Sequence, residues 1–112
     1  MANQVSKMDV PPGTFELLIL KALSLEPMHG LGISRRLEQL TRGSLQVNPG
    51  SFFPVLHRME DDGWIRGRWG YTENNRRAKY YRLTPAGRKK LQEEEKRWRG
   101  VASTILAILE AS

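Results

Sequence analysis

The chain has 112 residues, of which 39% are hydrophobic, so it is long enough for one folded domain and too hydrophobic for a disordered chain. It contains no cysteine, which excludes disulfides and thiolate metal sites, and no apolar run long enough to cross a bilayer. Its 18 Lys and Arg residues against 12 Asp and Glu give a net charge of +6, which favours a polyanionic partner, either nucleic acid or an acidic membrane surface.

The N-terminal half predicts a loose leader followed by helices. Residues 1–12 lack the apolar stretch of a signal peptide, and together with the missing cysteines this fits a cytoplasmic protein. Thr14 is a plausible N-cap for a helix over Phe15–Leu25, which is apolar nearly all round and therefore expected to be buried. A second helix is expected over Gly30–Thr41, where apolar residues recur at helical spacing.

A third helix is predicted over Phe52–Asp62, after a possible short strand at Leu45–Asn48 and with Ser51 as N-cap. Its apolar residues recur at i, i+3, i+4 and i+7, so this stripe is expected to face the core. The outer face then carries Ser51, Phe53, Pro54, His57 and Arg58.

The pattern changes to strands after this helix. Residues alternate over Trp64–Tyr71 and again over Lys79–Leu83, and the polar stretch Thr72–Arg77 between them predicts a hairpin turn. From Trp64 to Lys90 there are nine basic residues and one acidic residue. Three helices followed by a hairpin with a basic tip predict a winged helix-turn-helix, a mainly α fold with a small β-hairpin.

The last predicted helix runs from Pro85 to about Leu109, with Thr84 as N-cap. Gly100 weakens it by up to ~1 kcal/mol, so its path there is left open. Apolar residues at heptad spacing predict a long C-terminal dimerisation helix over 85–112, beside a DNA-binding domain over 13–84. The expected dimer interface comprises Leu91, Trp98, Val101, Ile105, Ile108 and Leu109.

Few residues suggest catalysis or metal binding. The chain has no glycine-rich phosphate loop, and its two histidines, His29 and His57, have no second ligand at metal spacing. Asp61 and Asp62 resemble ordinary surface acids at a helix end. We therefore expect no enzymatic activity, no cofactor and no metal site.

Binding of double-stranded DNA accounts better for the polar and basic residues on the third predicted helix and on the hairpin turn. The major groove accommodates one α-helix, and the third helix has the length and a distinct outer face for it. Ser51 and the free amides of the helix N-terminus are suited to a phosphate, and Phe53 to a thymine methyl group or a sugar. The expected DNA-binding residues are Asn48, Ser51, Phe53, Pro54, His57 and Arg58 on the helix, and Asn74, Asn75, Arg76, Arg77 and Lys79 on the wing.

Two alternatives share the basic charge. A basic RNA-binding protein is one, although the chain lacks the aromatic platforms with glycine-rich flanks that are typical of RNA binders. A winged-helix protein-interaction module, whose wing contacts an acidic partner, is the other.

Five blocks of sequence resemble the PadR family of bacterial transcription regulators, and together they span most of the chain. They are Gly13–Leu20, Met28–Ile33, Asn48–Glu60, Gly63–Ile65 and Arg77–Gly87. The resemblance implies a homodimeric winged helix-turn-helix repressor that binds pseudo-palindromic sites and is often released by small aromatic ligands. It also implies that the helix carrying residues 50–54 enters the major groove.

Two positions depart from the family pattern. Phe53 and Leu31 stand where the family commonly has Tyr, which puts two contacts to DNA in question. The short C-terminal part resembles the compact members, in which an aromatic residue at the dimer interface stacks on a flat ligand. Trp98 is the candidate for such a ligand-binding residue.

Overall fold

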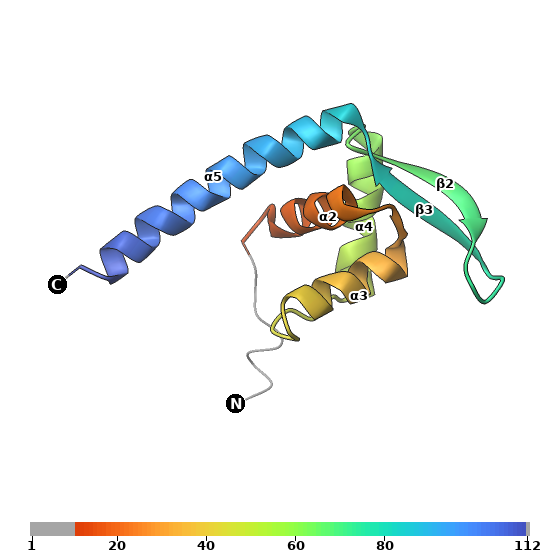
Figure 1. Ribbon diagram of the computed structural model, residues 1–112, viewed down its shortest axis with the longest axis horizontal. Helices are drawn as coiled ribbons and strands as arrows, with labels where there is room; N and C mark the ends of the chain where they lie inside the picture. The colour runs from red at the N-terminus through yellow and green to blue at the C-terminus, as the bar shows by residue number, and fades with distance from the viewer. Residues whose placement is uncertain (1–10, 112) are drawn as a thin grey trace.

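The computed structural model describes residues 11–111, which form four helices and a small three-stranded antiparallel sheet (Figure 1). This is the winged-helix fold that the sequence predicts. The leader expected over residues 1–12 lies outside the described residues, apart from Pro11 and Pro12. In chain order the elements are α2 (Thr14–Leu25), β1 (Met28–His29), α3 (Gly30–Leu40), α4 (Pro49–Asp61), β2 (Ile65–Tyr71), β3 (Arg77–Leu83) and α5 (Pro85–Leu109).

Helix α4 begins three residues earlier than the sequence predicts. Its N-cap is Asn48, whose side-chain oxygen accepts a hydrogen bond from the Gly50 amide at 2.8 Å, and not Ser51. Pro49 occupies the first helical position, where its fixed φ suits the helix and its missing N–H costs nothing. The prediction placed the start at the last break before the apolar stripe and overlooked this stronger Asn-Pro signal.

The sheet contains one strand that the sequence does not predict. Strand β1 pairs with β3, with Met28 opposite Tyr81 and His29 opposite Tyr80, so the strand order is β1-β3-β2. Two residues are too few to show alternation. The short strand expected at Leu45–Asn48 does not form. That segment is a loop, and the Val47 amide donates to the Glu38 carboxylate at 3.1 Å instead of pairing with a strand.

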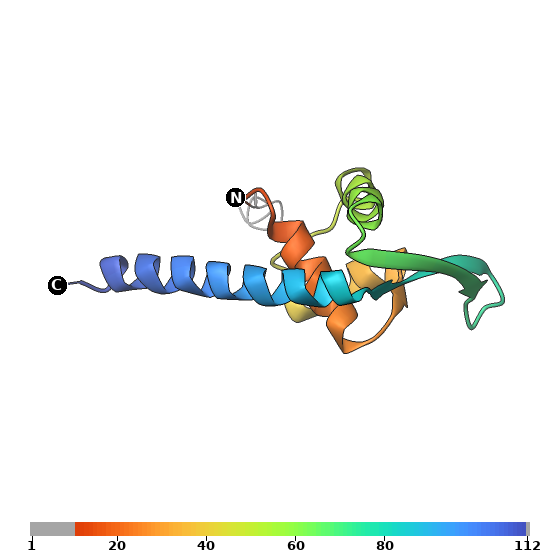
Figure 2. The same ribbon diagram turned by 90° about the horizontal axis from the view of Figure 1, so that it is seen from above.

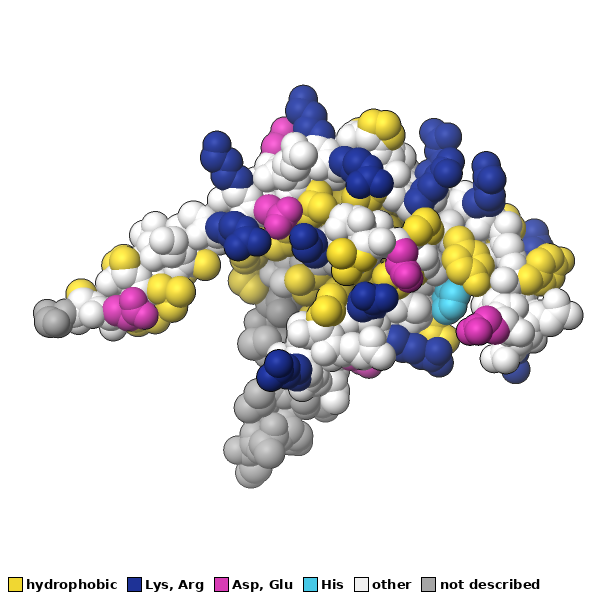
Figure 3. Space-filling view, in the orientation of Figure 1, with side chains coloured by type: hydrophobic (Ala, Val, Ile, Leu, Met, Phe, Trp, Pro, Cys, Tyr) yellow, Lys and Arg dark blue, Asp and Glu magenta, His cyan; other side chains and the backbone are white. Residues whose placement is uncertain are grey.

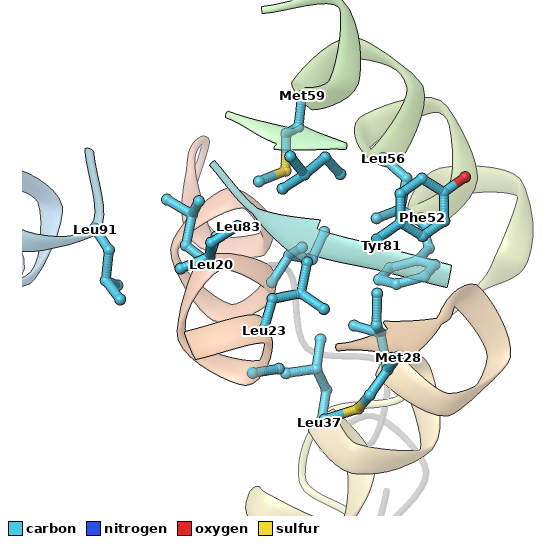
Figure 4. Close-up of a cluster of buried hydrophobic side chains, with 14 of the residues drawn as sticks. Leu20, Leu23, Met28, Leu37, Phe52, Leu56, Met59, Tyr81, Leu83 and Leu91 are labelled. Atoms are coloured by element: carbon cyan, nitrogen blue, oxygen red, sulfur yellow. The ribbon is translucent and has the colours of Figure 1, made fainter. Parts of the chain in front are cut away.

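The core lies where α2, α4 and the sheet meet (Figure 4). From α4 the buried side chains are Phe52, Leu56 and Met59, as their spacing predicts, and each is fully buried. Tyr81 and Leu83 cover them from β3. Each apolar side chain of this size contributes roughly 1.5–3 kcal/mol on burial, so the inner face of α4 holds that helix firmly and leaves its other face outward.

The first half of α5 belongs to the same packed unit. Leu91 is 7% exposed and lies in the core, so the interface role expected for it is wrong: its own domain already covers it. Lys21 on α2 pairs with Glu95 on α5 at 3.8 Å, which holds the two helices side by side. Thr84 caps α5 as predicted, because its hydroxyl accepts from the Gly87 amide at 3.0 Å.

Beyond Glu95, α5 continues through Gly100 as one helix and leads away from the rest of the molecule (Figure 2). The Cα radius of gyration is 15.5 Å, whereas a compact domain of this length has about 13 Å. From Val101 onward every described residue is exposed. The C-terminal half of the helix therefore packs against no other element among residues 11–111.

Candidate nucleic-acid interface

The outer face of α4 is open to solvent, as the sequence predicts. The exposed residues there include all six that were expected to contact DNA, namely Asn48, Ser51, Phe53, Pro54, His57 and Arg58. The acidic residues of α4 lie at its C-terminal end, so its first two turns carry no carboxylate. This half of the helix can approach a polyanion without like-charge repulsion.

The amides at the start of α4 are already used within the chain. The Gly50 amide donates to the Asn48 side chain, and the amides of Ser51 and Phe52 donate to the Asn48 carbonyl at 3.0 and 2.9 Å. The expectation that free amides there would hold a phosphate is therefore wrong. The Ser51 hydroxyl and the positive end of the helix dipole remain suited to an anion.

Phe53 faces partly inward, against the expectation of an outward ring. It is 36% exposed, and its ring meets the Phe52 ring edge-on with the centroids 5.4 Å apart. The ring also covers Gly30, where a Cβ atom would come within 2.5 Å of Phe53 Cε1. Because Gly30 leaves this space, α4 can lie close to the start of α3.

The same ring lines a groove of about 370 Å³ between the start of α3 and the hairpin of β2 and β3, to which α4 contributes Phe53. Leu31 and Trp69 contribute apolar surface to the groove, and Arg76 and Arg77 contribute cationic groups. The start of α3, the Phe53 ring and the hairpin thus form one concave surface with an apolar floor and a basic edge. This shape suits a nucleic-acid strand, whose sugars are largely apolar and whose phosphates are anionic.

Two of the expected DNA-binding cations are engaged within the protein. Arg58 forms a salt bridge with Glu16 of α2. Lys79 donates to Glu60 of α4 at 3.0 Å, and this hydrogen bond raises the pKa of the lysine above its usual value of 10.5. The Gly67 amide donates to the other Glu60 oxygen at 3.2 Å. Lys79 is thus placed to hold the hairpin against α4.

The hairpin tip is ordered by its own hydrogen bonds and presents its polar side chains outward. The Thr72 amide donates to the Arg76 carbonyl at 2.8 Å, and Asn75 adopts a left-handed conformation at φ +61°, which asparagine tolerates well. The residues expected at the tip, Asn74, Asn75, Arg76 and Arg77, are all exposed.

Two exposed aromatic residues beside the tip were not among the predicted site residues. Trp69 is 57% exposed and Tyr71 is 69% exposed, on the same hairpin face as Arg77 and Lys79. The Arg77 guanidinium lies over the Trp69 ring, 4.4 Å from its centroid. The sequence does contain a signal for them: the alternation that places Ile65 in the core continues along β2 to Trp69 and Tyr71, past the part of the hairpin that the helices bury.

The two histidines have different surroundings. His29 is the N-cap of α3, because its Nδ1 accepts from the Gly32 amide at 3.0 Å, whereas His57 is exposed on α4. Among residues 11–111 no group of three or more His, Asp or Glu side chains is placed to hold a metal ion. None of the described helices combines the length and the apolar character needed to cross a bilayer.

The surface carries its positive charge over the folded domain rather than over the end of α5. Lys and Arg side chains are scattered over the helices and along the hairpin in the view of Figure 3, while the projecting end of α5 shows mainly hydrophobic and uncharged groups. The end of α5 beyond Gly100 therefore exposes apolar side chains and carries no Lys or Arg, whereas the folded domain exposes cations together with apolar residues such as Trp69 and Tyr71. This difference is consistent with two kinds of contact, one with a polyanion and one with a protein.

Comparisons with known proteins show which family this fold and sequence belong to. The model of the transcriptional regulator PadR-like family matches residues 19–93. The chain is 32% identical to transcriptional regulator Rv3488 of Mycobacterium tuberculosis over 80% of each protein. A PadR-like transcriptional regulator from Bacillus cereus superposes with a TM-score of 0.79 at 29% identity, over 89% of this chain and 95% of that one. A PadR-like transcription factor from Bacteroides fragilis gives 0.71 at 29% identity, over 86% and 90%.

Proposed function

The chain belongs to the PadR-like family of transcriptional regulators, and from this premise we propose that it represses transcription by binding a pseudo-palindromic operator as a homodimer. The family is one of regulators rather than enzymes, and membership implies regulation through DNA binding. A soluble regulator of this kind acts in the cytoplasm.

The observation that carries the proposal is the exposed outer face of α4, whose Phe53 ring borders the groove beside the basic hairpin. The exposed face of α4 enters the major groove, where His57 reaches base edges or phosphates and Ser51 binds a phosphate. Arg76 and Arg77, at the edge of the groove, contact the flanking backbone. Trp69 and Tyr71 add apolar contacts to the sugars.

The projecting half of α5 supports the homodimer. Five of its large apolar residues are exposed, namely Val101, Ile105, Leu106, Ile108 and Leu109, and an apolar surface of this kind marks a contact site. Ile105 is 50% exposed and Ile108 is 69% exposed, at heptad spacing from Trp98 and Val101. A second copy of α5 covers this surface best, because a two-fold axis pairs each stripe with itself. The interface then comprises Trp98, Val101, Ile105, Ile108 and Leu109, without Leu91.

A homodimer explains the form of the operator. Two copies of α4 related by a two-fold axis reach successive major-groove faces, about 34 Å apart. The bound DNA then contains two inverted half-sites separated by one helical turn. Each phosphate that a Lys or Arg neutralises steepens the salt dependence by about 0.9 in log K against log salt concentration.

Release by a small aromatic ligand is the regulatory part of the proposal. The Arg97 guanidinium covers one side of the Trp98 ring, 5.1 Å from its centroid, so a flat ligand stacks on the other side, between the two protomers. A planar dye such as acridine tests this part. It quenches the tryptophan fluorescence of the wild type and has a weaker effect on Trp98→Leu. Equal quenching of both proteins contradicts stacking on Trp98.

The proposal is tested by selecting duplexes from a random library and titrating the winners by fluorescence anisotropy across salt concentrations. We expect an inverted repeat that binds far more tightly than scrambled DNA. Replacing His57 by alanine should weaken binding by about 1–3 kcal/mol if the contact is to a base. Arg76→Ala should instead lower the salt slope by about 0.9, because its contact is to the backbone. Lys89→Gln is the matched control, since it removes an exposed cation on α5, away from α4 and the hairpin tip. Equal binding of all duplexes, or preference for single-stranded RNA, contradicts the proposal.

A further inference from the structure

The sheet has a second basic face, turned away from the helical core. On β2 and β3 the buried residues Ile65, Tyr81 and Leu83 share one face, so the intervening residues lie on the other. That face carries Arg66, Arg68 and Arg82, all exposed. These arginines lie on the side of the hairpin opposite to the groove beside α4.

Arg66 and Arg82 stand directly opposite each other in the β2–β3 register. Like charges at such paired positions are destabilising, because side chains directly across two antiparallel strands have their Cβ atoms about 5 Å apart. Hydrophobic or oppositely charged pairs would stabilise the hairpin here. A pair of arginines that costs stability indicates a role other than folding.

These two arginines line a pocket of about 430 Å³ at the base of the hairpin. Arg88, from the first turn of α5, lines the pocket from a third element, and Leu23 and Leu83 contribute apolar surface. The volume lies within the range of small-molecule sites, about 300–1,000 Å³. Three guanidinium groups from three elements therefore border one cavity.

The carboxylates that line the pocket do not neutralise its three arginines. Glu26 is the one carboxylate among its lining residues, and it pairs with Arg36 at 3.9 Å. Within residues 11–111, Arg66, Arg82 and Arg88 take part in no salt bridge and no side-chain hydrogen bond. Their donors are available to a ligand.

We propose that the pocket of Arg66, Arg82 and Arg88 binds a phosphate group. Guanidinium is planar and stays charged, and its forked N–H donors match the oxygens of a phosphate in a bidentate way. A bound phosphate also relieves the repulsion between Arg66 and Arg82. The same chemistry has two sources, a free phosphorylated small molecule or the backbone of duplex DNA.

The position of the pocket favours the free molecule. Arg82 and Arg76 are six residues apart on one strand and its turn, which corresponds to roughly 20 Å. The pocket also faces away from α4. The site therefore goes beyond the proposed operator contacts, and its test needs no operator.

Calorimetric titration with inorganic pyrophosphate tests the proposal on the full-length protein. The wild type should bind one pyrophosphate per chain, and Arg66→Gln/Arg82→Gln should bind at least tenfold more weakly. Arg88→Gln should also weaken pyrophosphate binding, which tests the contribution of α5 independently. The matched control is Arg68→Gln, on the same sheet face but outside the pocket, which should bind within about twofold of the wild type. Without pyrophosphate the double variant should melt no lower than the wild type.

A parallel titration with a scrambled duplex separates the two sources. If the ligand is a free molecule, the double variant and the wild type show the same salt slope for DNA. If the source is the DNA backbone, the slope of the double variant falls by about two, because two phosphate contacts are lost. The proposal is overturned if the wild type binds no pyrophosphate saturably and the DNA slope is unchanged. It is also overturned if Arg68→Gln weakens pyrophosphate binding as much as the double variant, since diffuse charge would then explain it.

Discussion

Glu60 and Lys79 join α4 to the hairpin through a hydrogen bond of 3.0 Å between Oε1 and Nζ. The second carboxylate oxygen of Glu60 accepts from the Gly67 amide of β2 at 3.2 Å, so one side chain on α4 holds both strands. We therefore expect this contact to help set the angle between α4 and the hairpin.

Replacing Glu60 by alanine should therefore weaken operator binding without unfolding the protein. The Gly67 amide and the Lys79 ammonium both lose an acceptor, at a cost on the order of 1–2 kcal/mol to the hairpin. Hydrogen exchange should rise over residues 65–83. Glu60→Gln keeps an acceptor for the Gly67 amide, so its operator affinity and its hydrogen exchange should lie between those of the wild type and Glu60→Ala. Unchanged exchange and affinity in Glu60→Ala would show that the contact does not set the hairpin position.

Gly30 should be required for the position of Phe53. A Cβ atom in Gly30→Ala meets the Phe53 ring at 2.5 Å, so the ring must move out of the groove. We expect lower affinity for the operator, measured by anisotropy, with a modest loss of melting temperature. Gly32→Ala is the control in the same helix, since its Cβ has only ordinary contacts, the nearest at 3.5 Å. Equal affinities for the two variants would contradict the role of the ring.

Gly87 should be indispensable for docking α5. A Cβ atom there overlaps the Trp64 carbonyl oxygen, a backbone atom that cannot turn aside. Gly87→Ala should lower the free energy of unfolding by about 1–3 kcal/mol or more. Gly100→Ala, where nothing lies within 4 Å, should instead raise it by up to ~1 kcal/mol, because alanine favours the helix. Thermal denaturation of both variants measures the contrast, and a shift in the same direction for both would refute this explanation.

Ile105→Asp should produce a monomer that remains folded. The side chain is 50% exposed in the protomer, so the charge costs little there, but it is buried and unpaired at the proposed helix–helix contact. Ser103→Asp places the same charge on the opposite face of α5 and should remain dimeric. Light scattering after gel filtration measures the mass, and anisotropy should show specific operator binding lost only in the first variant. A dimeric Ile105→Asp would overturn the proposed interface.

Glu94 should stabilise α5 near neutral pH and lose this contribution in acid. The hydrogen bond from Arg97, 2.8 Å long, holds the pKa of this carboxyl below its usual value of 4.5. The unfolded chain therefore takes up a proton at higher pH than the folded chain does. The contribution of Glu94 is fully present above pH 4.5 and is lost as the pH falls through its folded pKa. Melting curves from pH 7 to pH 3 should show the wild type converging on Glu94→Gln, and a constant difference would argue against it.

Local patterns in the sequence are sufficient for most of the fold. The apolar spacing of Phe52, Leu56 and Met59 predicts the buried face of α4, and Thr84-Pro85 predicts the start of α5. These features arise from neighbouring residues, since helical periodicity and capping act within one or two turns. The exposed face of α4 is predicted for the same reason.

Contacts between distant residues are beyond such patterns. Strand β1 exists because β3 offers it a hydrogen-bonding edge more than fifty residues later, which no two-residue pattern can reveal. Lys79 was expected to contact DNA, yet Glu60 binds it, and Leu91 fits the heptad spacing of an interface, yet α2 and the sheet cover it.

By itself the sequence determined which faces are apolar, which are basic and where α5 begins, because these depend on residue type and spacing. Only the tertiary structure decided which cations are free. An ion pair or a buried side chain depends on distances between elements, and packing alone sets those distances. The tertiary structure pairs Lys79 with Glu60 of α4. It leaves Arg66, Arg82 and Arg88 without a partner among the described residues.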